Sequence, residues 1–235
     1  MLITVYGRMP VLEALLDEGI PVTKVLLART ARGEVVDEIV AAARARGVTL
    51  QKVAPEKVTR VSGNGRHDQG VVADVDAPGL RELDEIPGGP LAVLVLDGIT
   101  NPANVGMVLR TATAAGLDGV VLPRAGSPDL GPLVVKASAG IALRATVLTV
   151  ATAAAGVERL RAAGVEVIGL GGDAGESLLG AELPERAAYV LGSETDGVSV
   201  ACDRWLSIPM ANGVESLNVA VAAGLVAYEV ARRRR

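Results

Sequence analysis

The chain has 235 residues, is 50% hydrophobic and only 2% aromatic, and carries a formal net charge of −4. One cysteine, Cys202, rules out an internal disulfide and a cysteine-based zinc site, and one histidine, His67, argues against a histidine metal centre or a Ser-His-Asp triad. These counts lead us to expect no metal. No apolar run is long enough to span a membrane and no secretion signal is recognisable, so we expect a cytoplasmic protein.

Residues 1–75 alternate between strand and helix patterns, which is typical of a small α/β unit. The expected strands and helices cover residues 1–6, 10–18, 22–28, 34–46, 48–53 and 71–75. Between the last two strands lies a glycine-rich loop, 62–70, in which Arg66, His67 and Gln69 supply hydrogen-bond donors. This loop is either an RNA contact or a mobile hairpin.

Basic residues are concentrated in the first half of the chain. Residues 24–66 contain nine basic and four acidic side chains, Arg60 and Arg66 among them. Such a window favours a polyanion partner, although a solvated helix face has the same composition. The basic tail, 232–235, would either touch RNA or stabilise the end of the last helix.

Residues 76–90 are rich in proline, glycine and acidic residues, which indicates a linker between two domains. After it, a β-branched strand ends at Asp97, and a helix with Gly116 at its far end follows, for which Asn104 is the expected cap. By itself this segment is equally typical of an ordinary βα unit.

Further strands and helices follow that segment. They are expected at 119–122, 134–142, 145–150, 151–163, 165–170, 187–191, 206–209 and 214–232. Alternating strands and helices with glycine-rich exits predict a parallel α/β sheet whose ligands gather where the strands end.

Three exit segments carry the polar residues of this half, at 101–110, 191–197 and 208–218. None contains the Gly-x-Gly-x-x-Gly pattern or a phosphate-binding Gly-Lys-Ser/Thr loop, which disfavours a nucleotide-dependent metabolic enzyme. Together they resemble the SpoU (TrmH-like) family of RNA ribose 2′-O-methyltransferases in the SPOUT superfamily. The matching residues are Asn101-Pro102-Ala103-Asn104-Val105-Gly106 with Arg110, Leu191-Gly192-Ser193-Glu194 with Gly197, and Ile208-Pro209-Met210 with Ser216-Leu217-Asn218-Val219-Ala220.

The resemblance covers nearly the whole chain. Tyr6-Gly7, the helix at 11–15 and Gln69-Gly70-Val71 look like the family's L30e-like RNA-binding domain. The resemblance therefore implies an L30e-like domain at 1–75, a linker at 76–90, and a SPOUT methyltransferase domain at 91–235 whose parallel sheet contains a deep trefoil knot. It also implies a homodimer, formed through the closing helix and the knot, in which both subunits contribute to each active site.

The implied cofactor is S-adenosyl-L-methionine, and the implied substrate is RNA. By resemblance, the cofactor-binding residues are Leu170, Gly171, Gly192, Ile208, Met210, Ser216 and Leu217. The implied catalytic and positioning residues are Arg110, Asn104, Glu194, Ser216 and Asn218, although Ser216 and Asn218 could simply cap the last helix. Arg60, Arg66, His67, Gln69 and Arg110 are the expected RNA contacts.

Arg110 is the conspicuous catalytic group, because no histidine or carboxylate pair offers a general base. A guanidinium with a pKa above 12 is a poor base, so its physical role is to bind an RNA phosphate and stabilise developing alkoxide charge. The proton acceptor stays open. One departure from the family is Thr195, where a small residue is usual, which puts the local cofactor fit in question.

The layout most resembles enzymes that methylate a guanosine of 23S ribosomal RNA. A tRNA target and an antibiotic-resistance methyltransferase acting on another 23S nucleotide are the alternatives within the same chemistry. A non-catalytic RNA-binding or ribosome assembly factor is the alternative of another class, against which the intact set of motif residues argues.

Overall fold

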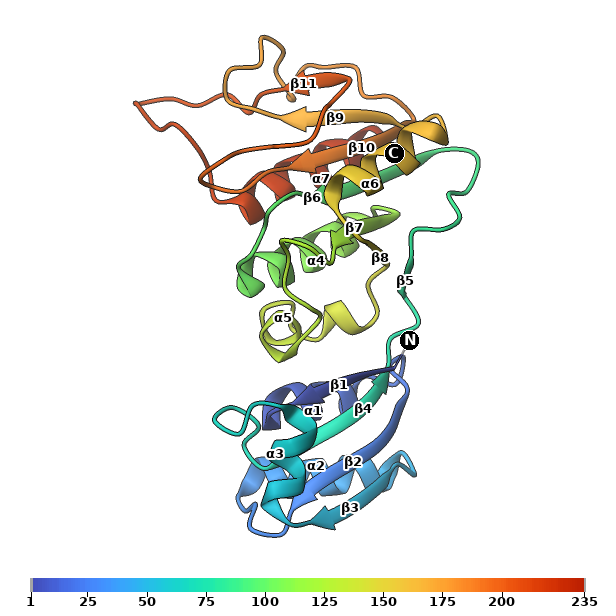
Figure 1. Ribbon diagram of the computed structural model, residues 1–235, viewed down its shortest axis with the longest axis vertical. Helices are drawn as coiled ribbons and strands as arrows, with labels where there is room; N and C mark the ends of the chain where they lie inside the picture. The colour runs from blue at the N-terminus through green and yellow to red at the C-terminus, as the bar shows by residue number, and fades with distance from the viewer. Residues whose placement is uncertain (1, 235) are drawn as a thin grey trace.

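The structure is a computed structural model that describes residues 2–234 and contains two sheets joined by a short connection (Figure 1). Met1, expected in the first strand, and Arg235, expected in the basic tail, lie outside the described residues. Within residues 2–234, no helix is both long and apolar enough to cross a bilayer.

The N-terminal unit is a four-stranded mixed sheet with the order β1-β4-β2-β3. Its elements are β1 (Leu2–Tyr6), α1 (Arg8–Leu16), β2 (Val22–Ala28), α2 (Glu34–Ala45), β3 (Thr49–Val53), α3 (Pro55–Ser62) and β4 (Val71–Asp76). Strand β4 runs antiparallel to β1 and β2, whereas β2 and β3 are parallel. The expected strands are confirmed to within a residue. Helix α3 was missed, because it is only eight residues long and mostly polar, and Val58 is its one buried residue.

The C-terminal unit is a seven-stranded sheet with the order β11-β9-β10-β6-β7-β8-β5, in which every pairing is parallel. Its strands are β5 (Leu80–Glu82), β6 (Leu91–Leu96), β7 (Gly119–Pro123), β8 (Val147–Val150), β9 (Glu166–Leu170), β10 (Arg186–Leu191) and β11 (Arg204–Leu206). Its helices are α4 (Pro102–Ala115), α5 (Pro132–Ala137), the 3-10 helix η1 (Ile141–Leu143), α6 (Ala153–Ala162) and α7 (Val219–Arg233). The predicted parallel α/β sheet is confirmed.

Two aliphatic cores cover the two faces of this sheet. Alternate residues of β6 face opposite sides, so Leu94 packs with α4 and α7 while Val93 packs with α6. All of β6 is buried, as expected for a central parallel strand. The trefoil knot implied by the resemblance stays a prediction, because strand order alone does not define a knot.

The segment expected to be only a linker also contributes a strand. Leu80–Glu82 pairs with β8 as an edge strand, and the Leu83 amide donates to the Thr149 carbonyl at 3.0 Å. Leu80 and Leu83 are both buried, and this apolar anchoring explains why a proline- and glycine-rich segment lies along the sheet. The domain boundaries themselves stay a prediction.

The two units pack directly on each other through α1 and the α5–η1 region (Figure 1). Val135 of α5 and Leu143 of η1 are buried within the core of the N-terminal unit. Arg144 also approaches Asp17 at the end of α1, with Nε and Oδ2 3.8 Å apart. The N-terminal unit therefore packs against α5, the helix next to α4.

Candidate active site

The polar motif segments follow strands that are neighbours in the sheet. Strand β10 pairs with β6 on one side and with β9 on the other, and all three run in the same direction. Their exit loops therefore meet at one edge, together with the irregular segment 207–218 that precedes α7.

Asn101, not Asn104, caps helix α4. The Asn101 Oδ1 accepts from the Ala103 amide at 2.9 Å, and Pro102 occupies the first helical turn, where its missing N–H costs nothing. The expectation that Asn104 caps the helix is therefore wrong by one turn. Asn104 instead lies in the first turn of α4 and is buried, with 7% of its surface exposed. Its side-chain amide is therefore available for tertiary contacts.

Three motif residues meet in one hydrogen-bonded network. The Asn104 Nδ2 donates to Glu194 Oε1 at 3.3 Å, although the two residues are 90 positions apart. The Asn218 Nδ2 donates both to Asn104 Oδ1 and to Glu194 Oε1, each at 3.1 Å. Asn218 also caps α7, because its Oδ1 accepts from the Ala220 amide at 2.9 Å. Asn218 therefore both caps α7 and takes part in the network.

Glu194 is held by a tight turn after β10. The Ser193 and Gly197 backbones exchange two hydrogen bonds, of 3.1 and 3.0 Å, and Gly197 has a φ of 69°. A Cβ on Gly192 would collide with the Gly197 backbone, so only glycine fits at position 192, where the two backbone segments of the turn approach each other. Thr195 is exposed, and its hydroxyl donates to Asp196 Oδ2 at 2.8 Å. The departure at Thr195 is thus accommodated outside the cavity wall.

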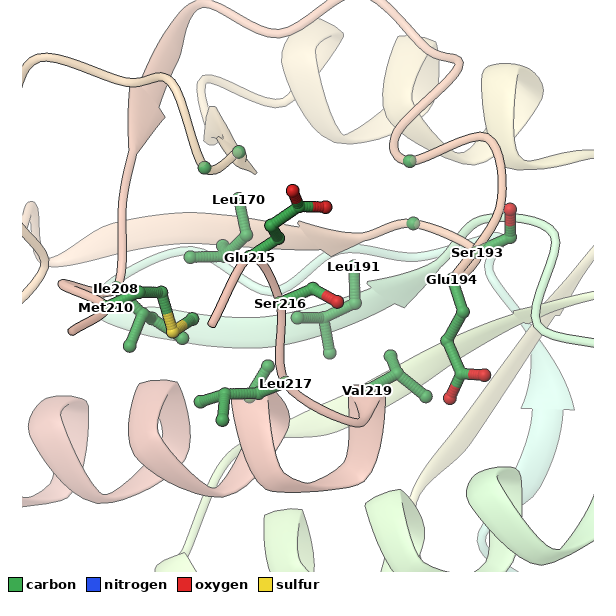
Figure 2. Close-up of a pocket in the computed structure, with 15 residues that line it drawn as sticks. Leu170, Leu191, Ser193, Glu194, Ile208, Met210, Glu215, Ser216, Leu217 and Val219 are labelled. Carbon is green, nitrogen blue, oxygen red and sulfur yellow. The ribbon is translucent and has the colours of Figure 1, made fainter. Parts of the chain in front are cut away.

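An open cavity lies beside this network (Figure 2). Its empty space, open solvent at the mouth included, is about 830 Å³. All seven residues expected at the cofactor line it: Leu170, Gly171, Gly192, Ile208, Met210, Ser216 and Leu217. Seven other lining residues were given no cofactor role from the sequence, although Leu191, Ser193, Gly197 and Val219 belong to the motifs themselves. The seven are Gly172, Leu191, Ser193, Gly197, Glu215, Val219 and Ala222.

The cavity suits a cofactor with an aromatic base and a charged tail. Aliphatic side chains from β9, β10 and the segment before α7 form its apolar wall, and Ser216 and Glu194 add polar groups near Leu217 and Val219 (Figure 2). Gly171, Gly172 and Gly192 also line the cavity, and of these three Gly172 is exposed. The residues present therefore fit the implied S-adenosyl-L-methionine.

Arg110 does not join the cavity of its own chain. It lies on α4 six residues after Asn104, which places it about 120° around the helix and about 9 Å along it. Its side chain is exposed and makes no hydrogen bond or ion pair with any residue between 2 and 234. All five guanidinium donors are therefore available to a partner outside the described chain.

The residues expected to contact RNA lie on the N-terminal unit. Arg60, Arg66 and His67 are exposed, whereas the side-chain oxygen of Gln69 accepts from the Arg8 amide at 2.9 Å. The buried Asp68 accepts from two nearby hydroxyls and from the backbone of residue 70, which ties the loop down. These bonds argue against the alternative of a mobile hairpin.

Asp97 is a structural residue of this edge that the sequence reasoning noted only as a strand end. Its carboxylate is buried and accepts from the Ser199 amide at 2.6 Å, the Ser199 hydroxyl at 2.9 Å and the Val200 amide at 3.3 Å. These bonds tie the exit of β6 to the segment after the Glu194 turn. No cluster of three or more histidine, cysteine or acidic residues suited to a metal exists among the described residues.

Comparison with known proteins agrees with this geometry. The SpoU rRNA methylase family model matches residues 91–228, and the model for RNA 2′-O ribose methyltransferase substrate binding matches residues 4–80. A 23S rRNA (guanosine-2′-O-)-methyltransferase of Ralstonia nicotianae is 38% identical over 208 residues, covering 85% of this chain and 83% of the relative. A protein of the same name from Xylella fastidiosa is 35% identical over 240 residues, covering 98% and 96%.

Solved structures extend the similarity to three dimensions. The SpoU methyltransferase AviRb from Streptomyces viridochromogenes, in complex with S-adenosylmethionine, matches with a TM-score of 0.76 and 26% identity. The match covers 99% of this chain and 90% of that chain, so both units are included. The chain therefore belongs to the SpoU rRNA methylase family.

Proposed function

We propose that the protein transfers a methyl group from S-adenosyl-L-methionine to the ribose 2′-hydroxyl of a guanosine in 23S ribosomal RNA. The observation that carries the proposal is the network of Asn104, Glu194 and Asn218, which joins all three motif segments beside an apolar cavity. The names of the relatives from Ralstonia and Xylella support the guanosine of 23S RNA as the target. From such a substrate we infer that the protein acts in the cytoplasm.

The cofactor, when bound, supplies an electrophilic methyl group on a sulfonium sulfur. Leu170, Ile208 and Leu217 would hold its apolar parts, and the backbone of the lining glycines Gly171 and Gly192 would contact its polar groups.

The network has a positioning task. Glu194 receives two amide donors on Oε1, while no hydrogen bond to its Oε2 comes from residues 2–234. The free oxygen can accept from a ribose hydroxyl, and Asn104 and Asn218 keep the carboxylate in place for that contact. Holding the ribose hydroxyl in line with the methyl group lowers the activation barrier, because alignment of the reactants can remove several kcal/mol from it.

Arg110 has an electrostatic task. A protonated guanidinium binds an RNA phosphate through two parallel hydrogen bonds and stabilises negative charge developing on the 2′-oxygen.

We also propose that the protein works as a homodimer through α7. Val221, Leu225 and Tyr228 form an exposed apolar stripe at helical spacing, with 52, 38 and 56% of their surfaces exposed. Met107 of the neighbouring α4 is 40% exposed as well. A symmetric pairing of this face would cover the stripe and bring Arg110 of the partner subunit, rather than the chain's own arginine, to each cavity.

Methyl transfer can be tested directly. The protein is incubated with methyl-labelled S-adenosyl-L-methionine and either 23S rRNA or tRNA, and the digested nucleosides are analysed by mass spectrometry. We expect 2′-O-methylguanosine from 23S rRNA alone. Label in tRNA would identify the other substrate class, and cofactor binding without transfer to either RNA would favour a non-catalytic assembly factor.

A further inference from the structure

Three loops converge at one end of the N-terminal sheet. They are the β1–α1 junction at 7–8, the β2–α2 loop at 29–33 and the α3–β4 loop at 63–70. The Ala28 amide donates to the Gly70 carbonyl at 2.8 Å, and a Cβ on Gly70 would already lie 3.3 Å from the Cβ atoms of Ala28 and Ala31. The exposed arginines of these loops are Arg29, Arg32 and Arg66.

Arg8 lies where the loops meet, and Gln69 holds it. The Arg8 amide donates to Gln69 Oε1 at 2.9 Å, and the Arg8 Nε donates to the Gln69 carbonyl at 3.3 Å. Gln69 reaches both positions with a φ of 51°, a left-handed conformation that few residues other than glycine adopt. Such a conformation persists only where the surroundings impose it.

The two Nη groups of the Arg8 guanidinium are available as hydrogen-bond donors. Only Nε is engaged, and neither Nη group makes a hydrogen bond or ion pair within residues 2–234. Gly33 leaves the space beside these groups open, because a Cβ there would lie 3.6 Å from Arg8 Nη1. An arginine held by Nε, with both Nη groups free, is arranged in advance to bind two oxygens of one anion.

We infer that Arg8 binds a backbone phosphate of the RNA substrate, at a position that we call the seat, and that Gln69 is the positioning residue of Arg8. This inference rests on the proposed function and specifies where the N-terminal unit holds that substrate. A phosphate accepts two parallel bonds from a guanidinium, and the three neighbouring arginines add positive charge for the same strand. The prior fixing of Arg8 reduces the entropy lost on binding.

The seat is connected to the methyl-transfer edge by packed helices. Arg8 begins α1, and this helix contacts α5, whose Val135 lies in the core of the N-terminal unit together with Leu143 of η1. Helix α5 in turn lies so close to Gly106 that a Cβ there would approach the Val134 carbonyl to 2.6 Å. Because Gly106 lies on α4 beside Asn104, the spacing from seat to site is fixed. A phosphate at Arg8 therefore selects which nucleotide of a folded RNA reaches the site.

RNA binding, measured without cofactor over a range of salt concentrations, tests the seat. We expect Arg8→Ala to weaken binding of a 23S rRNA fragment at least about 10-fold, and to reduce the log–log salt slope by about 0.7–0.9 for the lost phosphate contact. Arg8→Lys should keep the slope and lose a few-fold in affinity, since the charge remains but the fork does not. The matched control is Arg44→Ala, which removes the same charge from an exposed position in the last turn of α2, opposite the end at Gly33.

Gln69→Gly separates the positioning role from folding, because glycine keeps the positive φ while removing the amide. We expect weaker RNA binding at an unchanged thermal midpoint, with KM for RNA raised and kcat at saturating RNA retained. If Arg8→Ala and Gln69→Gly both match Arg44→Ala in affinity and slope, the seat is refuted even where methyl transfer is intact. Salt-sensitive binding that depends on Arg8 but yields no methylated RNA would instead refute the proposed function and leave the seat in place.

Discussion

Gly106 tests how tightly the catalytic helix is packed. A methyl group at this position would lie 2.6 Å from the Val134 carbonyl oxygen, 2.7 Å from the Ala137 Cβ and 3.0 Å from the Ser138 amide. Overpacking of this kind costs about 1–3 kcal/mol, whereas alanine in place of glycine within a helix gains about 1 kcal/mol. We therefore expect Gly106→Ala to lower or at best preserve stability, and to reduce methyl transfer by displacing Asn104.

Gly224→Ala is the matched control. It also replaces a glycine inside a helix, but its methyl group would meet Thr111 Cγ2 at 3.6 Å, an ordinary van der Waals contact. We expect it to gain up to about 1 kcal/mol, which places it about 1–3 kcal/mol above Gly106→Ala. Urea unfolding at one protein concentration measures the difference. A Gly106→Ala protein as stable as Gly224→Ala would show that the α4–α5 contact is loose.

Three further predictions concern the rest of the chain. The side-chain bonds from Arg232 and Arg233 hold the pKa of the Glu229 carboxyl at about 2, well below its usual range. The stability that Glu229 provides should thus be complete above about pH 4.5 and disappear as the pH falls toward 2, so the unfolding free energies of Glu229→Gln and wild type should differ most above about pH 4.5 and converge toward pH 2. Burial raises the pKa of the Cys202 thiol to about 11, so iodoacetamide at pH 8 should label it far more slowly than in urea; equal rates would contradict its burial. Leu225→Glu should disrupt the proposed dimer, so that in analytical ultracentrifugation the variant sediments as a monomer and the wild type as a dimer; equal masses would refute the proposed interface.

The strands and the sheet class could be predicted because their signal is local. The run of β6 is apolar on both faces, which is the pattern of a buried parallel strand, and Gly116 ends α4 with a φ of 76° as expected. Helix α3 escaped notice because its first residues, Pro55 to Lys57, are polar or turn-forming and only one of its side chains is buried.

The site was only partly predictable, because its contacts are not local. Motif resemblance supplied the residues around the cavity, but nothing in the sequence indicates that one carboxylate oxygen of Glu194 receives amides from positions 104 and 218. The cap was misplaced because Asn101 and Asn104 are equally good caps by type, and only the helix start at Pro102 decides between them. That Gln69 serves Arg8 depends on a backbone conformation that its residue type disfavours.

The role of Arg110 is the central claim, and single-turnover methyl transfer by Arg110→Ala tests it most directly. With 23S rRNA and cofactor both saturating, we expect the rate to fall by at least about 100-fold, as for loss of one preorganised donor at a developing charge. Cofactor affinity, measured by calorimetry, should stay within about twofold, since the task proposed for Arg110 is toward the RNA phosphate and the 2′-oxygen and not toward the cofactor. A wild-type rate in this variant would contradict the account.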